Sequence, residues 1–138
     1  MLGPEIFLKL FLAIVFSGLI GLEREMRDRP AGLRTHLLVC VGSTIFMIVA
    51  QDLFVGSPDA VSRIMQGVIT GIGFLGAGTI IISHSHIRGL TTAAGVWAVA
   101  GIGVVVGLGY YYLAAIAALV ILAIIKLYKI EYHWHMKK

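Results

Sequence analysis

The densest group of residues that could do chemistry is a charged segment running from Glu23 to His36. Acidic and basic side chains alternate along it, so the segment can pair with itself. Arginine also holds carboxylates and phosphates through two parallel hydrogen bonds. The segment therefore fits a positively charged membrane anchor, a clasp of internal ion pairs, or a site for a ligand or partner. Our candidate binding residues, here and further along the chain, are Glu23, Arg24, Glu25, Arg34, Arg88 and Thr91.

Histidine pairs are a second pattern with possible chemistry. His84 with His86, and His133 with His135, form two His-x-His pairs, and four imidazoles could bind zinc, nickel or copper. Histidines exposed on a loop and a tail are the more common case. We therefore predict no metal site.

Catalytic and nucleotide-binding patterns are weak. Ser17, Ser43, Thr91 and His36 offer nucleophiles or a base, but no set of serine, histidine and carboxylate is evident, and nothing resembles a nucleophile turn. The segment Gly71–Gly76 matches the dinucleotide fingerprint GxGxxG, which requires a strand before it and a helix after it in a soluble unit. Here it lies inside an apolar stretch. We predict a non-enzyme with no cofactor and no nucleic-acid partner.

Five apolar stretches must position all of these residues. Hydrophobic residues make up 59% of the 138 residues and charged residues 13%, against about 25% charged in ordinary soluble domains; the mean hydropathy is +0.95. Crossing a bilayer core of about 30 Å takes about 20 helical residues, and helices satisfy their own backbone where water is absent. The chain is thus predicted to be an all-α integral membrane protein, a single transmembrane domain over residues 1–138. The five spans are residues 6–22, 33–50, 64–82, 90–108 and 111–127.

Charge predicts the orientation of these spans. The second connector holds Asp52 and Asp59 with a single base, Arg63. The basic residues gather in the first and third connectors and in the tail: Arg24, Arg27, Arg29, Arg88, Lys126, Lys129, Lys137 and Lys138. Since an excess of lysine and arginine marks the cytoplasmic side, we expect the N-terminus outside and the C-terminus in the cytoplasm.

Two of the spans are rich in small residues. Small side chains let membrane helices pack with close backbones, so we expect a tightly packed hairpin of the third and fourth spans at the centre of the fold. Glycines that permit a broken helix around a substrate site are the alternative. The candidate packing residues are Gly67, Gly71, Gly73, Gly76, Gly78, Gly103 and Gly107.

The second span carries a polar stripe at helical spacing. Its members are His36, Cys40, Ser43 and Thr44, which share one helix face. They could line a small polar groove, although such side chains more often form hydrogen bonds between membrane helices. Arg34 lies at the start of the same span, where a charge is costly. We expect it to face Glu23, Glu25, a lipid phosphate or a bound anion.

Several motifs of this chain resemble the MgtC/SapB family. They are Gly21–Glu25, Arg29–Thr35, Gly71–Gly78 and Arg88–Ala94, followed by Trp97 and Gly101–Gly103. The resemblance covers Gly18 to Lys126. It implies a bacterial inner-membrane protein with five spans and a cytoplasmic C-terminus. It also implies a link to growth under magnesium limitation, survival inside host cells and modulation of membrane partners, including the F-type ATP synthase.

The chain also departs from the family pattern. Better-studied members carry a cytoplasmic ACT-like domain after the fifth span, whereas this chain ends at Lys138, so we expect a short member with the membrane module alone. Position 36 is His, and position 91 is Thr, where some members have Asn. These two differences weaken the transfer of residue roles.

The residues do not favour the magnesium transport that is often ascribed to this family. Magnesium requires octahedral oxygen ligands and loses water reluctantly, yet the second to fifth predicted spans contain no Asp or Glu. We therefore predict a small regulatory membrane protein that binds other membrane proteins, with a homodimer also possible. The alternative is a transporter or channel for magnesium or another ion, and binding of anionic lipid is a third interpretation.

Overall fold

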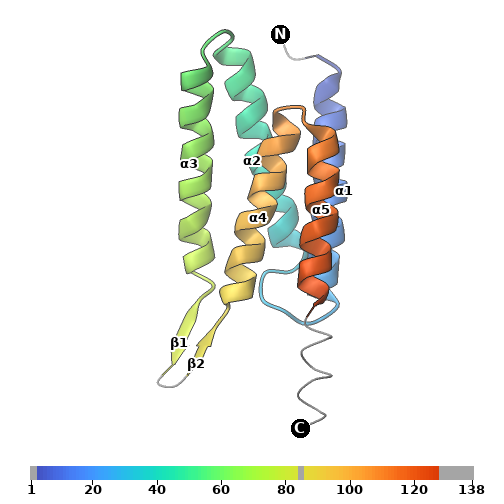
Figure 1. Ribbon diagram of the computed structural model, residues 1–138, viewed down its shortest axis with the longest axis vertical. Helices are drawn as coiled ribbons and strands as arrows, with labels where there is room; N and C mark the ends of the chain where they lie inside the picture. The colour runs from blue at the N-terminus through green and yellow to red at the C-terminus, as the bar shows by residue number, and fades with distance from the viewer. Residues whose placement is uncertain (1–2, 84–85, 128–138) are drawn as a thin grey trace.

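The computed structural model describes residues 3–83 and 86–127. Consecutive helices run in opposite directions, so the connectors alternate between the two ends of the bundle (Figure 1). The α1–α2 connector, the β-hairpin and the end of α5 meet at one end, which contains Arg24, Arg27, Arg29 and Arg88 and is called the basic end below. The elements are α1 (Glu5–Glu25), α2 (Leu33–Leu53), α3 (Pro58–Ala77), β1 (Ile81–Ser83), β2 (His86–Arg88), α4 (Leu90–Gly107) and α5 (Tyr111–Lys126).

The helices are built for a bilayer. Of the helices described, α1 to α4 are long and apolar enough to cross a membrane, which confirms a mostly helical, multi-pass membrane protein. Helix α5 is also apolar but has 16 residues, and at 1.5 Å per residue it is about 24 Å long. That is shorter than a hydrocarbon core of about 30 Å, so a fifth crossing stays a prediction.

The third helix does not occupy the predicted residues 64–82. It begins earlier because Pro58 takes the first helical position, where a missing N–H is no loss, and the polar residues after it continue the helix. It ends earlier because Thr79 caps the last turn of the helix: its Oγ1 donates a hydrogen bond of 2.8 Å to the Gly76 carbonyl. Hydropathy alone misplaced both ends because it reads apolar composition and not backbone geometry.

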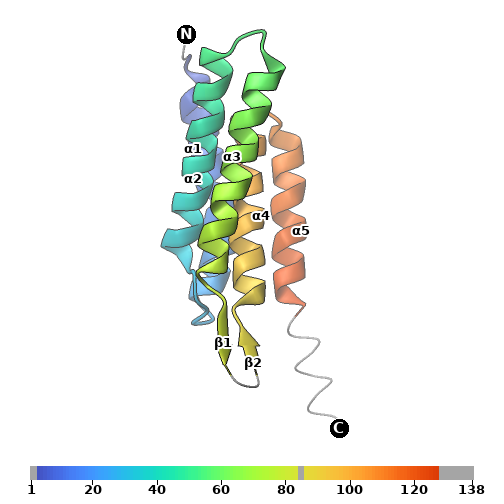
Figure 2. The same ribbon diagram turned by 90° about the vertical axis from the view of Figure 1, so that its left-hand side faces the viewer.

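A two-stranded antiparallel hairpin follows α3, where the sequence had predicted the end of the third span and a short connector. Ile81 lies opposite Arg88, and Ile82 lies opposite Ile87. The side chains of isoleucine branch at Cβ, which favours strands over helices. Their apolar character had suggested a continuing membrane helix. Figure 2 shows that the hairpin extends beyond the ends of α3 and α4.

The centre of the bundle is formed by α2 and α4, not by the predicted hairpin of the third and fourth helices. Half of the α4 span is buried, against 6% of the α3 span. The core combines Cys40 of α2, Val99 and Ile102 of α4, and Ala13 and Ile20 of α1. Helix α3 stands at the edge of the bundle, where it borders α2 and α4 (Figures 1 and 2).

Two glycines of α4 allow it to lie directly against the backbone of α2. A Cβ on Gly103 would be 2.3 Å from the carbonyl oxygen of Cys40, and one on Gly107 would be 2.6 Å from the Cβ of Met47. Thr44 closes the same contact, since its Oγ1 donates to the Gly103 carbonyl at 3.0 Å. The glycines of α4 therefore pack against α2, whereas the sequence had suggested α3.

The glycines of α3 have different surroundings. A Cβ added at Gly67, Gly71 or Gly73 would meet no described atom within 4 Å. Gly76 is buried against Ala93 of α4, with a Cβ-to-carbonyl distance of 3.4 Å, and Gly78 adjoins only its own helix. A side chain at any of the first three positions would thus meet no described neighbour, and Gly67 and Gly71, one helical turn apart, share one face of α3.

The α2–α4 contact predicts a difference between two alanine variants of α4. In Gly103→Ala the new methyl group collides with the backbone of α2, and we expect a loss of about 1–3 kcal/mol of stability. Gly101→Ala is the matched control, because a Cβ there meets open space. Thermal unfolding of both variants in detergent measures the difference. Equal melting temperatures would show that the contact is looser than described.

The alternation of connectors predicts which surfaces face the same side. Met26, at the basic end, and Ser57, at the opposite end, are both exposed. We expect a membrane-impermeant thiol reagent to label Ser57→Cys in intact cells and Met26→Cys only in inverted vesicles. The unmodified chain is the control, because its Cys40 is buried. Labelling of both variants from one side would refute the topology.

Candidate functional site

The basic end brings together segments that are far apart in the sequence. The end of α1, the α1–α2 connector, strand β2 and the start of α4 meet there (Figure 1). The connector reverses direction through left-handed backbone conformations at Asp28 and Ala31, with φ of 50° and 57°. Such conformations are uncommon outside glycine, so this turn is held by its surroundings.

A pocket of about 840 Å³ lies between these segments and is called the arginine pocket below. The candidates Arg24, Arg88 and Thr91 line it. Its other lining residues were not among the candidates: Arg27, Arg29, Pro30, Ile87, Gly89, Leu90, Thr92 and Ile125. The sequence does contain the two further arginines in the charged segment. It gives no sign that Thr92 matters, because the rotation of α4 decides which threonine faces inward.

Arg24 is the buried member of the pocket wall. It is 6% exposed, and its Nη2 donates a hydrogen bond of 2.9 Å to Oγ1 of Thr92, which is also buried. This bond joins the last turn of α1 to the first turn of α4. Arg27 and Arg29 repel the Arg24 guanidinium, and Glu23 attracts it.

The two acidic candidates have separate partners. Glu23 is 4% exposed and forms an ion pair with Arg27 one turn later. Glu25 instead caps the next helix, because its Oε2 accepts a hydrogen bond of 2.8 Å from the backbone N–H of Leu33. Gly32 makes room for this cap, since a Cβ there would lie 1.8 Å from the same oxygen. Each of the two carboxylates thus has its partner within the basic end.

Arg34 lies outside this arrangement. Its side chain is exposed and forms no ion pair with another described residue, so the expected pairing with Glu23 or Glu25 was wrong. The reason is the early turn of the connector, which directs Glu25 to the backbone of α2. Contact of Arg34 with a lipid phosphate or an anion stays a prediction.

His36 is completely buried at the start of α2. Its Nδ1 lies 2.9 Å from the Gly32 carbonyl, and because a carbonyl only accepts, Nδ1 carries the proton. Nε2 is then an acceptor, and it has no hydrogen-bond partner among the described residues. Gly95 of α4 lies close by, since a Cβ added there would be 3.8 Å from this nitrogen.

The rest of the polar stripe lies in the packed interior. Cys40, Ser43 and Thr44 are all buried. Ser43 donates to the Val39 carbonyl at 2.8 Å, and Thr44 donates to Cys40 at 2.9 Å as well as to Gly103 of α4. The stripe therefore joins α2 to α4 through Thr44, and its buried side chains do not form a polar groove.

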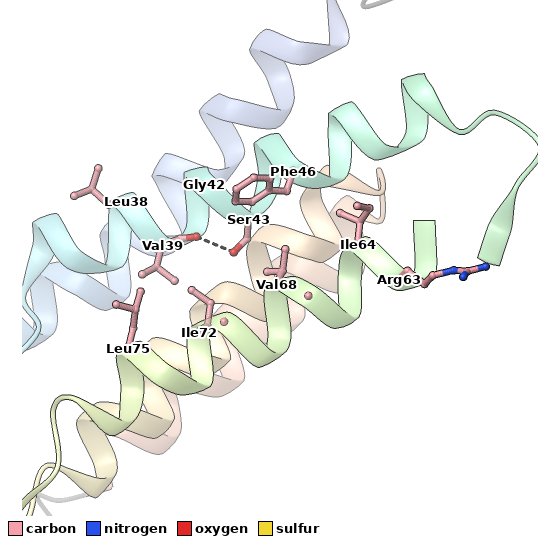
Figure 3. Close-up of a pocket in the computed structure, with 12 residues that line it drawn as sticks. Leu38, Val39, Gly42, Ser43, Phe46, Arg63, Ile64, Val68, Ile72 and Leu75 are labelled. Atoms are coloured by element: carbon pink, nitrogen blue, oxygen red, sulfur yellow. Dashed lines mark hydrogen bonds between the residues drawn. The ribbon is translucent and has the colours of Figure 1, made fainter. Parts of the chain in front are cut away.

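A different groove opens between α2 and α3. It has a volume of about 570 Å³ and an almost entirely apolar lining, and we call it the α2–α3 groove. Figure 3 shows Val68 and Ile72 of α3 directed toward α2, while Arg63 points away. Ser43 also lines the groove, and Figure 3 marks the bond of its hydroxyl to Val39. The remaining lining residues are Leu38, Gly42, Phe46, Ile64, Gly67, Gly71 and Leu75.

One member of the two histidine pairs lies within the described residues. His86 is exposed on β2, whereas His84, His133 and His135 lie outside the described residues. Within residues 3–83 and 86–127, no three or more His, Cys, Asp or Glu side chains are grouped so as to hold a metal ion.

Lys9 forms a second polar tie, at the end of the bundle opposite the arginines. Its Nζ donates to the Gly107 carbonyl at 2.8 Å and to Oε1 of Gln51 at 3.3 Å. The C-terminal end of a helix carries a partial negative charge that favours a cation. Lys9 thus fastens α1 to the end of α4, as Arg24 fastens it to the start.

These features define a class: a multi-pass α-helical membrane protein with a buried arginine tie and a positively charged pocket at one end. Within that class the chain belongs to the MgtC family, whose model matches residues 10–132. The family resemblance noted in the sequence is therefore confirmed.

Three relatives indicate how far the similarity extends. "Putative magnesium transporter YhiD" of Escherichia coli is 45% identical over 130 residues, which cover 90% of this chain and 60% of that protein. Protein MgtC of Salmonella typhimurium is 45% identical over 115 residues, covering 83% and 48%. An uncharacterized protein of Haemophilus influenzae is 39% identical over 141 aligned residues, covering 96% and 59%. The chain thus spans about half the length of these curated relatives. No solved structure matches it significantly.

The tie between α1 and α4 predicts different effects for two adjacent threonines. Thr92→Val removes the acceptor of Arg24 and leaves a buried donor unsatisfied, which costs about 1–3 kcal/mol of stability. Thr91→Val makes the same change at an exposed position, and we expect its effect to be smaller than about 0.5 kcal/mol. Melting temperatures in detergent test this. Equal stability of both variants would mean that the tie does not stabilise the bundle.

Proposed function

We propose that this chain is a regulatory membrane protein of magnesium homeostasis, which acts by binding other membrane proteins. The observation that carries the proposal is the contrast between a sealed interior and an open outer face. Backbone contact closes α2 against α4, whereas the α2–α3 groove is open and Gly67 and Gly71, which line it, are exposed. The link to magnesium comes from the family and from the name of the E. coli relative.

The distribution of oxygen ligands argues against a path for magnesium. Magnesium retains its water and is bound through carboxylates and carbonyls in octahedral geometry. The acidic residues of the described helices lie near helix ends: Glu5, Glu23, Glu25, Asp52 and Asp59. At the basic end a divalent cation would also meet four arginines of the arginine pocket. A transporter or channel is the alternative function.

The outer face of α3 suits a transmembrane helix of a partner. In a bilayer, helices associate through close packing of small residues, because lipid is as apolar as the side chains it replaces. Gly67 and Gly71 are four residues apart, are exposed, and border the α2–α3 groove. A partner helix in the groove would contact their backbone directly. A second copy of this chain is another occupant that the experiments below distinguish.

The buried hydroxyl groups support a function without catalysis. Ser17 and Ser43 donate to backbone carbonyls of their own helices at 2.6 and 2.8 Å. His36 has no carboxylate hydrogen-bonded to it in the described part of the chain. The printed names of the relatives also describe no enzyme.

The family resemblance and the charges suggest the location, the orientation and one candidate partner. From the resemblance we propose the bacterial inner membrane, and the positive-inside rule predicts the basic end and C-terminus in the cytoplasm and the N-terminus outside. The family resemblance makes the F-type ATP synthase one candidate for the regulated protein.

Flux measurements separate regulation from transport. Purified protein is reconstituted into sealed liposomes that contain a fluorescent magnesium indicator. We expect no magnesium entry above that of empty vesicles. Entry that depends on the protein, and that is lost in Gly76→Leu, would instead establish the alternative function.

A growth experiment tests whether function depends on the face of α3 that carries Gly67 and Gly71, which we call the docking face. In a strain that lacks the endogenous gene, we expect the wild-type chain to support growth in low magnesium and Gly71→Leu to fail, because leucine fills the groove. Gly101→Leu is the matched control, since Gly101 is exposed on α4 outside the groove. Crosslinks from position 67 would show whether the occupant is a partner or a second copy. Normal growth with Gly71→Leu would refute the docking face.

A further inference from the structure

We propose that the arginine pocket is a binding site for a phosphate group carried by a larger molecule. This proposal is independent of the α2–α3 groove and of the regulatory function. The lining includes Arg24, Arg27, Arg29 and Arg88 but no acidic side chain. Guanidinium groups bind phosphate oxygens with paired, charge-assisted hydrogen bonds.

The nearby carboxylates of Glu23, Glu25 and Asp28 do not line the pocket. Glu23 forms an ion pair with Arg27 and also attracts Arg24, and Glu25 accepts a hydrogen bond from the backbone N–H of Leu33. Arg24 is more than nine-tenths buried in the wall, and the described residues accept one hydrogen bond from it, although its side chain has five N–H donors. The bond to Thr92 fixes the Arg24 guanidinium in the pocket wall, and its remaining N–H groups are donors for a bound anion.

The start of α4 adds backbone donors to the same pocket. Gly89 precedes the helix with φ of 91°, and no side chain caps the first turn. Only glycine fits there, because a Cβ would lie 2.0 Å from the Thr79 carbonyl. The first N–H groups of a helix have no acceptor within the helix, and together with the helix dipole they attract anions. Leu90, Thr91 and Thr92 of this turn all line the pocket.

Size and lining indicate a phosphate that is part of a larger ligand. The volume of about 840 Å³ far exceeds what one phosphate needs, and the lining also includes the apolar side chains of Ile87, Leu90 and Ile125. The pocket lies at the end of the helix bundle, where bilayer meets water. Both a phospholipid headgroup and a soluble phosphate ester offer this chemistry.

The test compares two basic residues at the same end of the molecule. Arg88 lines the pocket from the β-hairpin outside the helix bundle, so Arg88→Gln leaves the helix core intact. Lys126→Gln is the control that removes the same charge, because Lys126 is exposed at the end of α5 but does not line the pocket. Purified protein in neutral detergent is titrated calorimetrically with ATP in the absence of magnesium. Native mass spectrometry measures retention of phosphatidylglycerol relative to phosphatidylcholine.

The results identify the source of the phosphate or overturn the site. If the ligand is soluble, Arg88→Gln weakens ATP binding by about tenfold or more, and Lys126→Gln by less than about twofold. If it is a lipid, ATP does not bind, and selective retention of phosphatidylglycerol is lost in Arg88→Gln but kept in Lys126→Gln. Binding of neither ligand, or equal losses in both variants, would overturn the proposal.

Discussion

The direct contact between the backbones of α2 and α4 is the constraint on which the other features depend. Where Gly103 and Gly107 pass Cys40 and Met47 there is no room for a side chain. This contact fixes the rotation and the height of α4 relative to α2. It thereby places Thr92 beside Arg24 and brings the first turn of α4 to the basic end. A looser contact would separate the residues that form the arginine pocket.

Polar ties at both ends keep α4 in this position. Arg24 of α1 is bonded to Thr92 near the start of α4, and Lys9 of α1 is bonded to the Gly107 carbonyl at its end. Both bonds place a cation of α1 against a polar group of α4, and both lie at the ends of the bundle, where long basic side chains can reach water. The apolar middle of the bundle is left to packing. The bundle therefore gains specificity without a charge at mid-membrane depth, where it would be most costly.

Helix α3 has a different relation to the bundle. It is tied to the rest through Gly76 and Ala93 and through the hairpin that follows it, while most of its length is exposed. A helix that buries little of its surface in its own chain offers that surface to lipid or to other proteins. The arginine pocket lies at the basic end of the bundle. No residue of α3 lines this pocket. The proposed regulatory contact and the proposed phosphate site therefore use separate surfaces.

The sequence by itself determined that the protein lies in a lipid bilayer and is mostly helical. It also determined the family motifs and the position of the charged connector, because each of these follows from composition and from residue order. It did not determine which glycines are packed. Gly67 and Gly71 have the same spacing as Gly103 and Gly107, yet only the second pair meets another helix, since a small residue permits close approach without causing it. The sequence also did not distinguish Thr91 from Thr92, or show that Glu25 would cap α2 and leave Arg34 exposed. These outcomes depend on the rotation of each helix about its axis, and that rotation is set by the packing of the whole bundle.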